Sequence, residues 1–345
     1  MNIVVLAGGF SPERDVSLTS SSLIANALMR RGHKVALVDV YRGLDRIPED
    51  ISSLFVTGVE YSYKVETSEP DLDALKTSCG GQEALIGPGV TELCRAADVV
   101  FVGLHGGMGE NGQLQATLDN MGIKHYTGTG YVGALLSMDK DIAKRLMNAS
   151  GVPTPDGVYF DTERDSADLI EEKVGFPCVI KPASCGSSVG VSKVYDRAGL
   201  DTALAAAKKY ERHVLAEKMI SGRELTCAVL DGKALPPVEI IPKSGWYDYA
   251  NKYQSGATTE ICPAPLTAED TARVGELALK AFNALRMEMY GRADFILCED
   301  GSLFCLEVNA LPGMTPTSLL PQEAAAVGIG YDDLCELLVD LASKK

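Results

Sequence analysis

An α/β fold is predicted for this chain by the order of its apolar runs and glycines. Apolar residues at 3–6 are followed by the turn Gly8-Gly9, by helical spacing at 17–31 and by a second apolar run at 35–40. A strand, a glycine turn, a helix and a strand in this order form a parallel α/β unit. A chain of 345 residues also exceeds the usual size of one hydrophobic core, so we expect two or three domains.

A third apolar run, at 99–104, predicts another buried strand, which ends at His105 and two glycines. Ligands of parallel sheets usually bind beyond the carboxyl ends of the strands, so His105 and the Gly8-Gly9 turn are expected to border one site. Downstream, the pattern predicts a helix at 135–150, strands at 179–182 and 214–219, and a hairpin at 225–236 with its turn at Asp231-Gly232. Residues 243–259 break into glycine, aromatic and polar residues, which indicates a functional loop or lid.

The composition excludes several classes of protein. A net charge of −15 argues against a nucleic-acid surface, because binding to phosphates needs an excess of Lys and Arg. The nine cysteines include no CxxC pair, which is typical of free thiols in a reducing compartment. No apolar stretch approaches the ~20 residues that cross a bilayer, and the amino terminus has the pattern of a first strand, not of a signal peptide. We therefore expect a cytoplasmic protein with no nucleic-acid or membrane partner.

The strongest functional signal is an acidic hairpin at 292–309. If Asp300-Gly301 forms a two-residue turn, Asp294 lies opposite Glu307, and Arg292 lies opposite Asn309. Because side chains alternate between the two faces of a strand, these four residues share one face. The other face then carries an apolar set, namely Ala293, Phe295, Leu297, Phe304, Leu306 and Val308.

This polar face predicts a metal site. Two carboxylates at ~5 Å, directly opposite each other, repel unless a cation offsets their charge. Two carboxylates and an amide oxygen suit Mg²⁺, which completes its shell with water and substrate phosphates. Asp294, Glu307 and Asn309 are therefore the candidate metal ligands. The alternative is a solvated hairpin face on which the charges stand by chance.

Two lysines and a glycine-rich loop predict a triphosphate site. Lys140 lies early in a helix, and Lys181 ends a strand just before the glycine-serine loop at 183–190. Lysines and free loop amides bind phosphate, although this loop is not a P-loop. Glu217 and Lys218, at a strand end, suit adenine, and the Glu224 carboxylate suits ribose hydroxyls. For these three the alternative is a set of surface salt bridges.

Together, the motifs resemble the D-alanine:D-alanine ligases of the ATP-grasp superfamily. The resemblance covers nearly the whole chain apart from about 43–89. It rests on motifs in a fixed order: Gly8 to Ser17, His105 to Gly112, Ser137 to Lys140, Lys181-Pro182 with Gly186 to Gly190, Glu217-Lys218, Tyr247 to Tyr249 with Lys252-Tyr253, Glu307 to Asn309, Pro312 to Thr315, and Ser318-Leu319.

The resemblance implies a three-domain ATP-grasp fold. Residues 1–127 would form an amino-terminal Rossmann-like parallel α/β domain on the side of the first D-alanine. Residues 128–217 would form the central ATP-grasp domain, and 218–345 the carboxy-terminal ATP-grasp domain with the lid and the metal hairpin. The implied reaction is ATP-dependent ligation of two D-alanines through a D-alanyl phosphate, for peptidoglycan precursor synthesis. Two Mg²⁺ ions, with Mn²⁺ as a substitute, and a homodimer are also implied.

The resemblance assigns roles to individual residues. Glu13 would bind the ammonium of the first D-alanine and His105 its carboxyl end, while Lys252, Ser318 and Leu319 would bind the second. The phosphates would be bound by Lys140 and Lys181, the adenine by Glu217 and Lys218, and the ribose by Glu224. Asp294, Glu307 and Asn309 would bind magnesium. Ser187 and Tyr253 would form a latch with Glu13 over the site.

The expected chemistry also gives Arg292 and the amide of Gly313 a catalytic role, because both are placed to stabilise the oxyanion of a tetrahedral intermediate. Three alternatives stay open at this point. The first is a related ligase that makes D-alanyl-D-serine or D-alanyl-D-lactate. The second is an oxidoreductase with a dinucleotide on the first α/β unit, although Gly8-Gly9 is not GxGxxG. The third is a nucleotide-binding regulator without catalysis.

Overall fold

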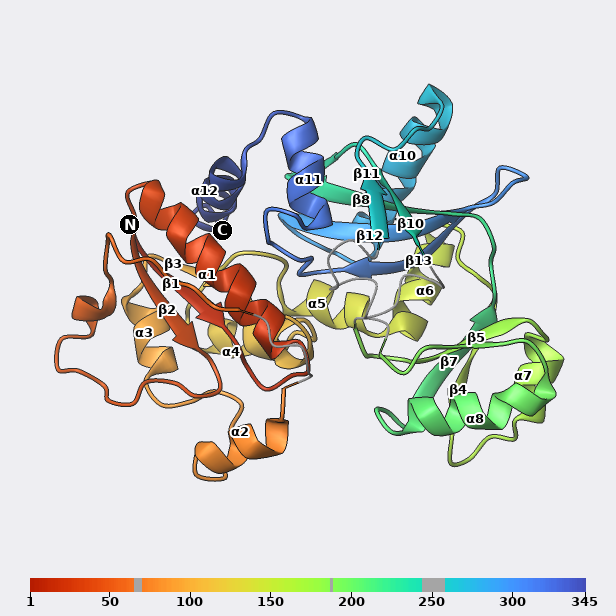
Figure 1. Ribbon diagram of the computed structural model, residues 1–345, viewed down its shortest axis with the longest axis horizontal. Coiled ribbons are helices and arrows are strands. Elements are labelled where there is room, and N and C mark those ends of the chain that lie inside the picture. Colours follow the sequence, from red (N-terminus) through yellow and green to blue (C-terminus); the bar gives the residue numbers. More distant parts are fainter. Residues whose placement is uncertain (65–69, 187–188, 244–257) are drawn as a thin grey trace.

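The computed structural model describes residues 1–64, 70–186, 189–243 and 258–345. Three sheets follow one another along the chain and divide it into three regions (Figure 1). The first sheet is parallel and the other two are antiparallel. The predicted α/β fold is confirmed. The exact domain boundaries stay predictions.

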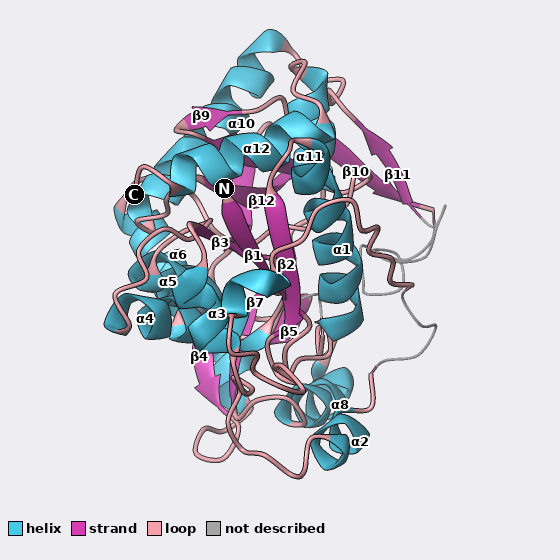
Figure 2. Cartoon of the chain, turned by 90° about the vertical axis from the view of Figure 1, so that its left-hand side faces the viewer, coloured by secondary structure: helices cyan, strands magenta, loops and turns pink. Residues whose placement is uncertain are grey.

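The amino-terminal sheet has the strand order β2-β1-β3, with β1 at Asn2–Ala7, β2 at Lys34–Asp39 and β3 at Val99–Val102. Its central strand is buried on both faces, as the uninterrupted apolar run requires. Helix α1 (Arg14–Arg30) packs on this sheet and, on its far end, against α12 (Tyr331–Ala342), so the last helix of the chain lies beside the first (Figures 1 and 2). Short helices follow: η1 (Ile51–Leu54), α2 (Leu72–Ser78), α3 (Val90–Ala96), η2 (Gly107–Gly109) and α4 (Gln113–Asn120).

The central sheet has the order β4-β7-β5-β6, with β4 at Gly157–Asp161, β7 at His213–Lys218, β5 at Cys178–Pro182 and β6 at Ser192–Val194. Helices α7 (Asp168–Lys173) and α8 (Arg197–Lys208) cover one face of it, and the lobe stands apart at the lower right of Figure 1. Phe160, Ile180 and Leu200 lie in its core.

The carboxy-terminal sheet has the order β11-β10-β8-β12-β13, with β9 (Lys233–Ala234) paired to β8. The strands are β8 (Arg223–Leu230), β10 (Val238–Pro242), β11 (Thr258–Ile261), β12 (Tyr290–Leu297) and β13 (Leu303–Asn309). The side chains of successive β8 residues point to opposite faces of the sheet. Cys227 and Val229 share a core with α10 (Ala268–Ala284), whereas Ala228 shares one with α11 (Leu319–Ala326).

The single helix predicted at 135–150 is wrong. The chain forms two helices, α5 (Tyr131–Met138) and α6 (Lys140–Ala149), because Asp139 adopts an extended conformation between them. The Asp139 carboxylate accepts hydrogen bonds from the amides of Asp141 and Ile142 and so caps the second helix. Helix α6 packs on the carboxy-terminal sheet through Ala143 and Met147, and Lys140 is its first residue.

All nine cysteines are free thiols, as predicted; five are buried and four are half-buried, and the reducing compartment stays a prediction. Within the described parts of the chain, no helix combines the length and the apolar character that a membrane span requires.

Candidate active site

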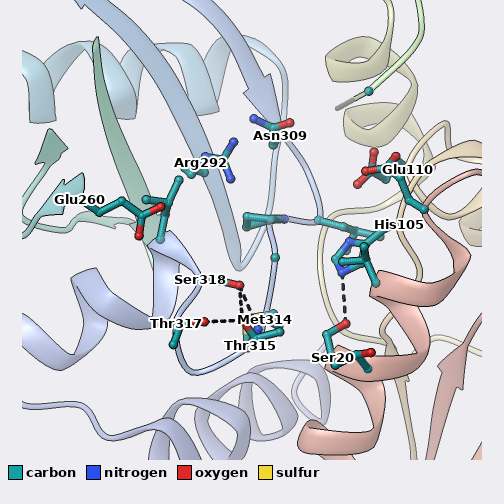
Figure 3. Close-up of a pocket in the computed structure, with 18 residues that line it drawn as sticks. Ser20, His105, Glu110, Glu260, Arg292, Asn309, Met314, Thr315, Thr317 and Ser318 are labelled. Atoms are coloured by element: carbon teal, nitrogen blue, oxygen red, sulfur yellow. Dashed lines mark hydrogen bonds between the residues drawn. The ribbon is translucent and has the colours of Figure 1, made fainter. Parts of the chain in front are cut away.

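One cavity of about 300 Å³ lies between the strand ends of the amino-terminal sheet and the α11 face of the carboxy-terminal sheet (Figure 3). Its lining includes residues from both ends of the chain. Seven of the predicted site residues line it: Glu13, His105, Arg292, Asn309, Gly313, Ser318 and Leu319. The structure therefore brings together groups that the sequence separates by up to three hundred positions.

The metal hairpin has the predicted pairs but not the predicted turn. Asp294 pairs with Glu307 and Arg292 pairs with Asn309, as expected, whereas Leu297 pairs with Leu303. The turn is longer than two residues, because the amide of Cys298 bonds to the carbonyl of Ser302 and Gly301 adopts a φ of 83°. A bulge after Asp294 shifts the register by one residue and restores the predicted pairs at the site end.

The same bulge changes the core face of β13. Phe304 and Leu306, which we predicted in the core, are only half-buried, and Leu303 and Cys305 take their places in the cluster with Phe295. The prediction failed here because a uniform alternation cannot include a bulge.

Asp294 is the most constrained carboxylate of the site. Arg292 binds it in a bidentate ion pair with two N···O distances of 2.8 Å, and Thr226 donates a hydrogen bond of 2.6 Å from β8. The side-chain amide of Asn309 donates a fourth bond, of 3.0 Å. Asp294 is only 9% exposed, so these donors replace the solvation that it loses.

Glu307 faces a second, smaller cavity of about 20 Å³ that Lys140, Glu110 and Asn309 also line. The Nζ of Lys140 lies 3.7 Å from Glu307 and donates a hydrogen bond of 2.6 Å to the carbonyl of Cys185. Lys140, a candidate for phosphate binding, and Glu307, a candidate metal ligand, therefore line the same small cavity. Among the residues that the structure describes, no three His, Cys, Asp or Glu side chains cluster as a ready metal site.

Lys181 and Glu217 form part of a buried charge cluster. Glu217 is 3% exposed and forms ion pairs with Lys181 and with Lys144, a residue that the sequence analysis missed. Burial alone would raise the pKa of Glu217, but the two lysines outweigh it and lower the pKa. The Glu217 side chain therefore lies between lysines, and its role with adenine stays a prediction.

Lys218 and Glu224 lie outside both cavities. Lys218 is exposed, with its Nζ 4.0 Å from Asp156, and its backbone amide bonds to the Asp156 carbonyl. Glu224 is half-buried on β8, in register with Ile240 and Ile296. Their roles with adenine and ribose also stay predictions.

Glu13 stands directly before α1 and is tightly enclosed. A Cβ atom placed on Gly106 would lie 2.6 Å from its Oε2, and one placed on Gly186 would lie 3.3 Å away. At Gly106, which also has a φ of 68°, a side chain would displace the carboxylate, whereas at Gly186 the contact would only be tight. His105 is 7% exposed and lies 3.2 Å from the Ser20 hydroxyl. Burial lowers its pKa despite the charge of Glu13, so the imidazole is neutral at pH 7.

Ser318 directly precedes α11, at the other end of the cavity. Its hydroxyl accepts a hydrogen bond of 3.1 Å from the amide of Thr315 and lies 2.8 Å from the Thr315 hydroxyl. A Cβ on Gly313 would approach this oxygen to 2.9 Å, so the Gly313 backbone passes close to Ser318. Ser187, Lys252 and Tyr253 lie outside the described residues, as does most of the predicted lid at 243–259.

Two further acids line the large cavity, Glu110 and Glu260. Burial and the charge of Glu13 raise the pKa of Glu110 to about 8. Its place within the run from His105 to Gly112 was a signal that could have marked it. Glu260, on the edge strand β11, accepts a hydrogen bond of 2.5 Å from Gln322. Nothing in the local sequence pattern singles it out.

Comparison with known proteins extends these observations. Residues 2–129 match the family model described as D-ala D-ala ligase N-terminus, and residues 146–340 match D-ala D-ala ligase C-terminus. A D-alanine–D-alanine ligase of Pediococcus pentosaceus is 42% identical, over 98% of this chain and 97% of that protein. One of Nitratidesulfovibrio vulgaris is 39% identical, over 99% and 98%.

Solved structures agree in fold. The D-alanine–D-alanine ligase of Bacillus anthracis complexed with ATP has a TM-score of 0.77 and 30% identity, over 100% of this chain and 97% of that one. The VanG D-Ala:D-Ser ligase of Enterococcus faecalis has a TM-score of 0.76 and 26% identity, over 99% of each chain.

Proposed function

Since the chain belongs to the D-alanine–D-alanine ligase family, we propose that it joins two D-alanines with the conversion of ATP to ADP and phosphate. The dipeptide product serves peptidoglycan precursor synthesis. The observation that carries the proposal is the single cavity that holds Glu13 and His105 at one end and Arg292, Gly313 and Ser318 at the other. Two bound amino acids require a cavity with two such polar ends, and a polar group between the two ends.

The proposed reaction has two steps. A carboxylate oxygen of the first D-alanine attacks the γ-phosphorus of ATP, and ADP leaves, which gives D-alanyl phosphate. The amine of the second D-alanine then attacks the carbonyl carbon and loses a proton, and inorganic phosphate leaves. No protein nucleophile is needed, so the residues act by position and charge.

The first D-alanine is assigned to the Glu13 end. The Glu13 carboxylate suits its ammonium, and the buried, neutral His105 suits its carboxyl group. Arg292 and the Gly313 amide are assigned to the oxyanion that forms at the carbonyl carbon. Lys252, Ser318 and Leu319 are assigned to the second D-alanine. Ser187 and Tyr253 are assigned to the latch with Glu13.

The nucleotide is assigned to the junction of the two antiparallel sheets. Lys140 and Lys181 would bind the phosphates, Glu217 and Lys218 the adenine, and Glu224 the ribose. Lys140 and Lys181 are each 7% exposed, so a phosphate that reaches them is largely shielded from water. Such shielding strengthens the interaction and protects the acyl phosphate from hydrolysis.

The donor set at the hairpin fits magnesium. Asp294 and Glu307 supply two carboxylates and Asn309 an amide oxygen, and Mg²⁺ takes its remaining ligands from phosphates and water. When bound, the ion offsets charge on the transferring phosphoryl group. Two ions, substitution by Mn²⁺ and a homodimer remain part of the proposal.

A D-alanyl-D-serine or D-alanyl-D-lactate ligase is the alternative, and the similarity to the VanG D-Ala:D-Ser ligase favours the first of these two. Phosphate release and product chromatography with D-alanine alone, then with added D-serine or D-lactate, distinguish the three. We expect D-alanyl-D-alanine as the main product at neutral pH and no product from L-alanine. A main product that contains serine or lactate would overturn the substrate assignment. The comparisons give no support to an oxidoreductase or to a non-catalytic regulator.

A further inference from the structure

Three charged side chains from three different elements meet in the interior. Lys144 comes from α6, Lys181 from β5 and Glu217 from β7. The Nζ of Lys144 lies 2.6 Å from Oε2 of Glu217, and Lys181 pairs with the other oxygen, Oε1. The side chains are 7%, 8% and 4% exposed, so this Lys144–Glu217–Lys181 cluster is shielded from water on all sides.

The cluster combines two basic side chains with one acidic side chain. Burial lowers the pKa of Lys144, which Glu217 partly offsets, and the two lysines keep Glu217 ionised. A buried carboxylate with two cationic partners can release one of them and remain paired with the other. With one partner it cannot, because release would leave an isolated buried charge.

Lys144 and Lys181 differ in their surroundings. Lys181 is the last residue but one of β5, close to the glycine-serine loop, where a phosphate would lie. Lys144 is one turn beyond Lys140 on α6, between Ala143 and Met147, which are buried in the core of the carboxy-terminal sheet. Among the described residues neither lysine lines a cavity, so the two differ in the element that carries them and in its distance from the glycine-serine loop. Lys144 is therefore held beside Glu217 by the packing of α6. Lys181 lies where it can exchange its contact with Glu217 for one with a phosphate.

We propose that Lys144 is a positioning residue for the nucleotide: it neutralises Glu217 and thereby frees Lys181 to bind an ATP phosphate. The inference rests on the proposed ATP site and adds a residue to it. Without Lys144, Glu217 would retain Lys181 as its only counter-ion and compete with phosphate for it. Lys144 itself needs no contact with substrate.

The test compares two probes, ADP and adenosine, which differ only in their phosphates. Isothermal titration calorimetry of the full chain at fixed magnesium gives the affinity for each probe. The quantity compared between variants is the ratio of the ADP affinity to the adenosine affinity. Lys144→Met should lower this ratio at least ~10-fold, since a charge-assisted bond to phosphate is lost. Lys144→Arg should recover most of it. Arg145→Met, which changes the next residue on the same helix and removes only a surface pair with Asp141, should leave the ratio unchanged.

A double variant separates positioning from simple structural damage. In Lys144→Met/Glu217→Gln the competing carboxylate is absent, so Lys181 is free again and the ratio should return to within about threefold of the wild-type ratio. A ratio that stays low in the double variant would overturn the proposal, as would an unchanged ratio in Lys144→Met. If Lys144→Met does not fold, the single variant Glu217→Gln tests the proposal. Its ratio should equal or exceed the wild-type ratio, and a lower ratio would overturn the proposal.

The two proposals fail separately. A wild-type chain that binds ADP but makes no D-alanyl-D-alanine would overturn the proposed function and leave this test intact. A wild-type chain that makes the dipeptide but keeps its ADP-to-adenosine ratio in Lys144→Met would overturn only the role of Lys144.

Discussion

Lys140 and Glu307 face each other where α6 begins and β13 ends, with Nζ and Oε2 3.7 Å apart. The backbone amide of Lys140 also bonds to the carbonyl of Ala183, at 2.9 Å, and its Nζ bonds to the carbonyl of Cys185. The first residue of α6 therefore fixes the start of the glycine-serine loop against the acidic hairpin. A phosphate that binds Lys140 is thereby brought beside the candidate metal ligands.

Glu307→Gln tests the hairpin directly. The change keeps the shape of the side chain but removes a carboxylate that would hold magnesium, so we expect product formation to fall at least ~100-fold. Phosphate release with D-alanine and MgATP measures the effect. Glu299→Gln, in the exposed turn of the same hairpin, is the matched control and should keep full activity. Near-normal turnover in Glu307→Gln would exclude Glu307 as a metal ligand.

Thr226→Val tests the support of Asp294. Thr226 is fully buried, and its hydroxyl donates the hydrogen bond of 2.6 Å to the carboxylate. Loss of a hydrogen bond to a charged group should lower the free energy of unfolding by about 1.5–3 kcal/mol. Urea denaturation measures this cost, and a magnesium titration of activity should shift to higher concentration. Thr117→Val removes a hydroxyl that bonds only to the helix carbonyl of Gln113, and a loss as large as that of Thr226→Val would contradict the assignment.

Gly106→Ala tests the enclosure of Glu13. The new methyl group would lie 2.6 Å from the Glu13 carboxylate, so the carboxylate must move. We expect KM for D-alanine to rise at least ~10-fold, from the loss of one charge-assisted contact. Gly122→Ala is the control, because Gly122 also has a positive φ, of 75°, but has no atom within 4 Å of its added Cβ. If KM for D-alanine rose equally in the two variants, backbone strain alone would account for the rise, and displacement of the Glu13 carboxylate would not.

The acidic hairpin shows how far the sequence alone could lead. The pairing of Asp294 with Glu307 followed from alternation and from an assumed two-residue turn, yet the actual turn is longer. The bulge at Leu306 compensates for it, so the two pairs were predicted correctly while the core residues Leu303 and Cys305 were not. Apolar patterning identifies faces but cannot locate an insertion of one residue.

Lys144 and Glu323 were missed for a different reason. Both stand on helices, where a charged residue usually faces solvent, and only tertiary packing shows that each is buried. Glu217 was placed on its strand correctly, but its two lysine partners come from segments far away in the sequence. The motifs of the resemblance supplied the predicted residues that line the large cavity, apart from Arg292. Buried charge partners carry no such local signal.

Glu323 gives a prediction about pH. It lies on α11 with no exposed surface, accepts a hydrogen bond of 2.6 Å from the amide of Ala228, and its Oε1 has no hydrogen-bond partner among the described residues. Burial raises its pKa well above the usual 4.5, so the folded protein binds this proton more tightly than the unfolded chain does. The resulting stabilisation is complete below pH 4.5 and is lost as the pH rises towards the folded-state pKa.

Glu323→Gln cannot titrate and keeps an acceptor for Ala228. Relative to this variant, the wild-type free energy of unfolding should fall by about 1.4 kcal/mol for each pH unit above the unfolded-state pKa, until the folded-state pKa is reached. Urea denaturation of both proteins at several pH values between about 5 and 8 measures the slope. Glu276→Gln, on the exposed side of α10, should run parallel to the wild type. A pH-independent difference between Glu323→Gln and the wild type would show that Glu323 is ionised in the folded protein, and that Arg292 or solvent compensates its charge.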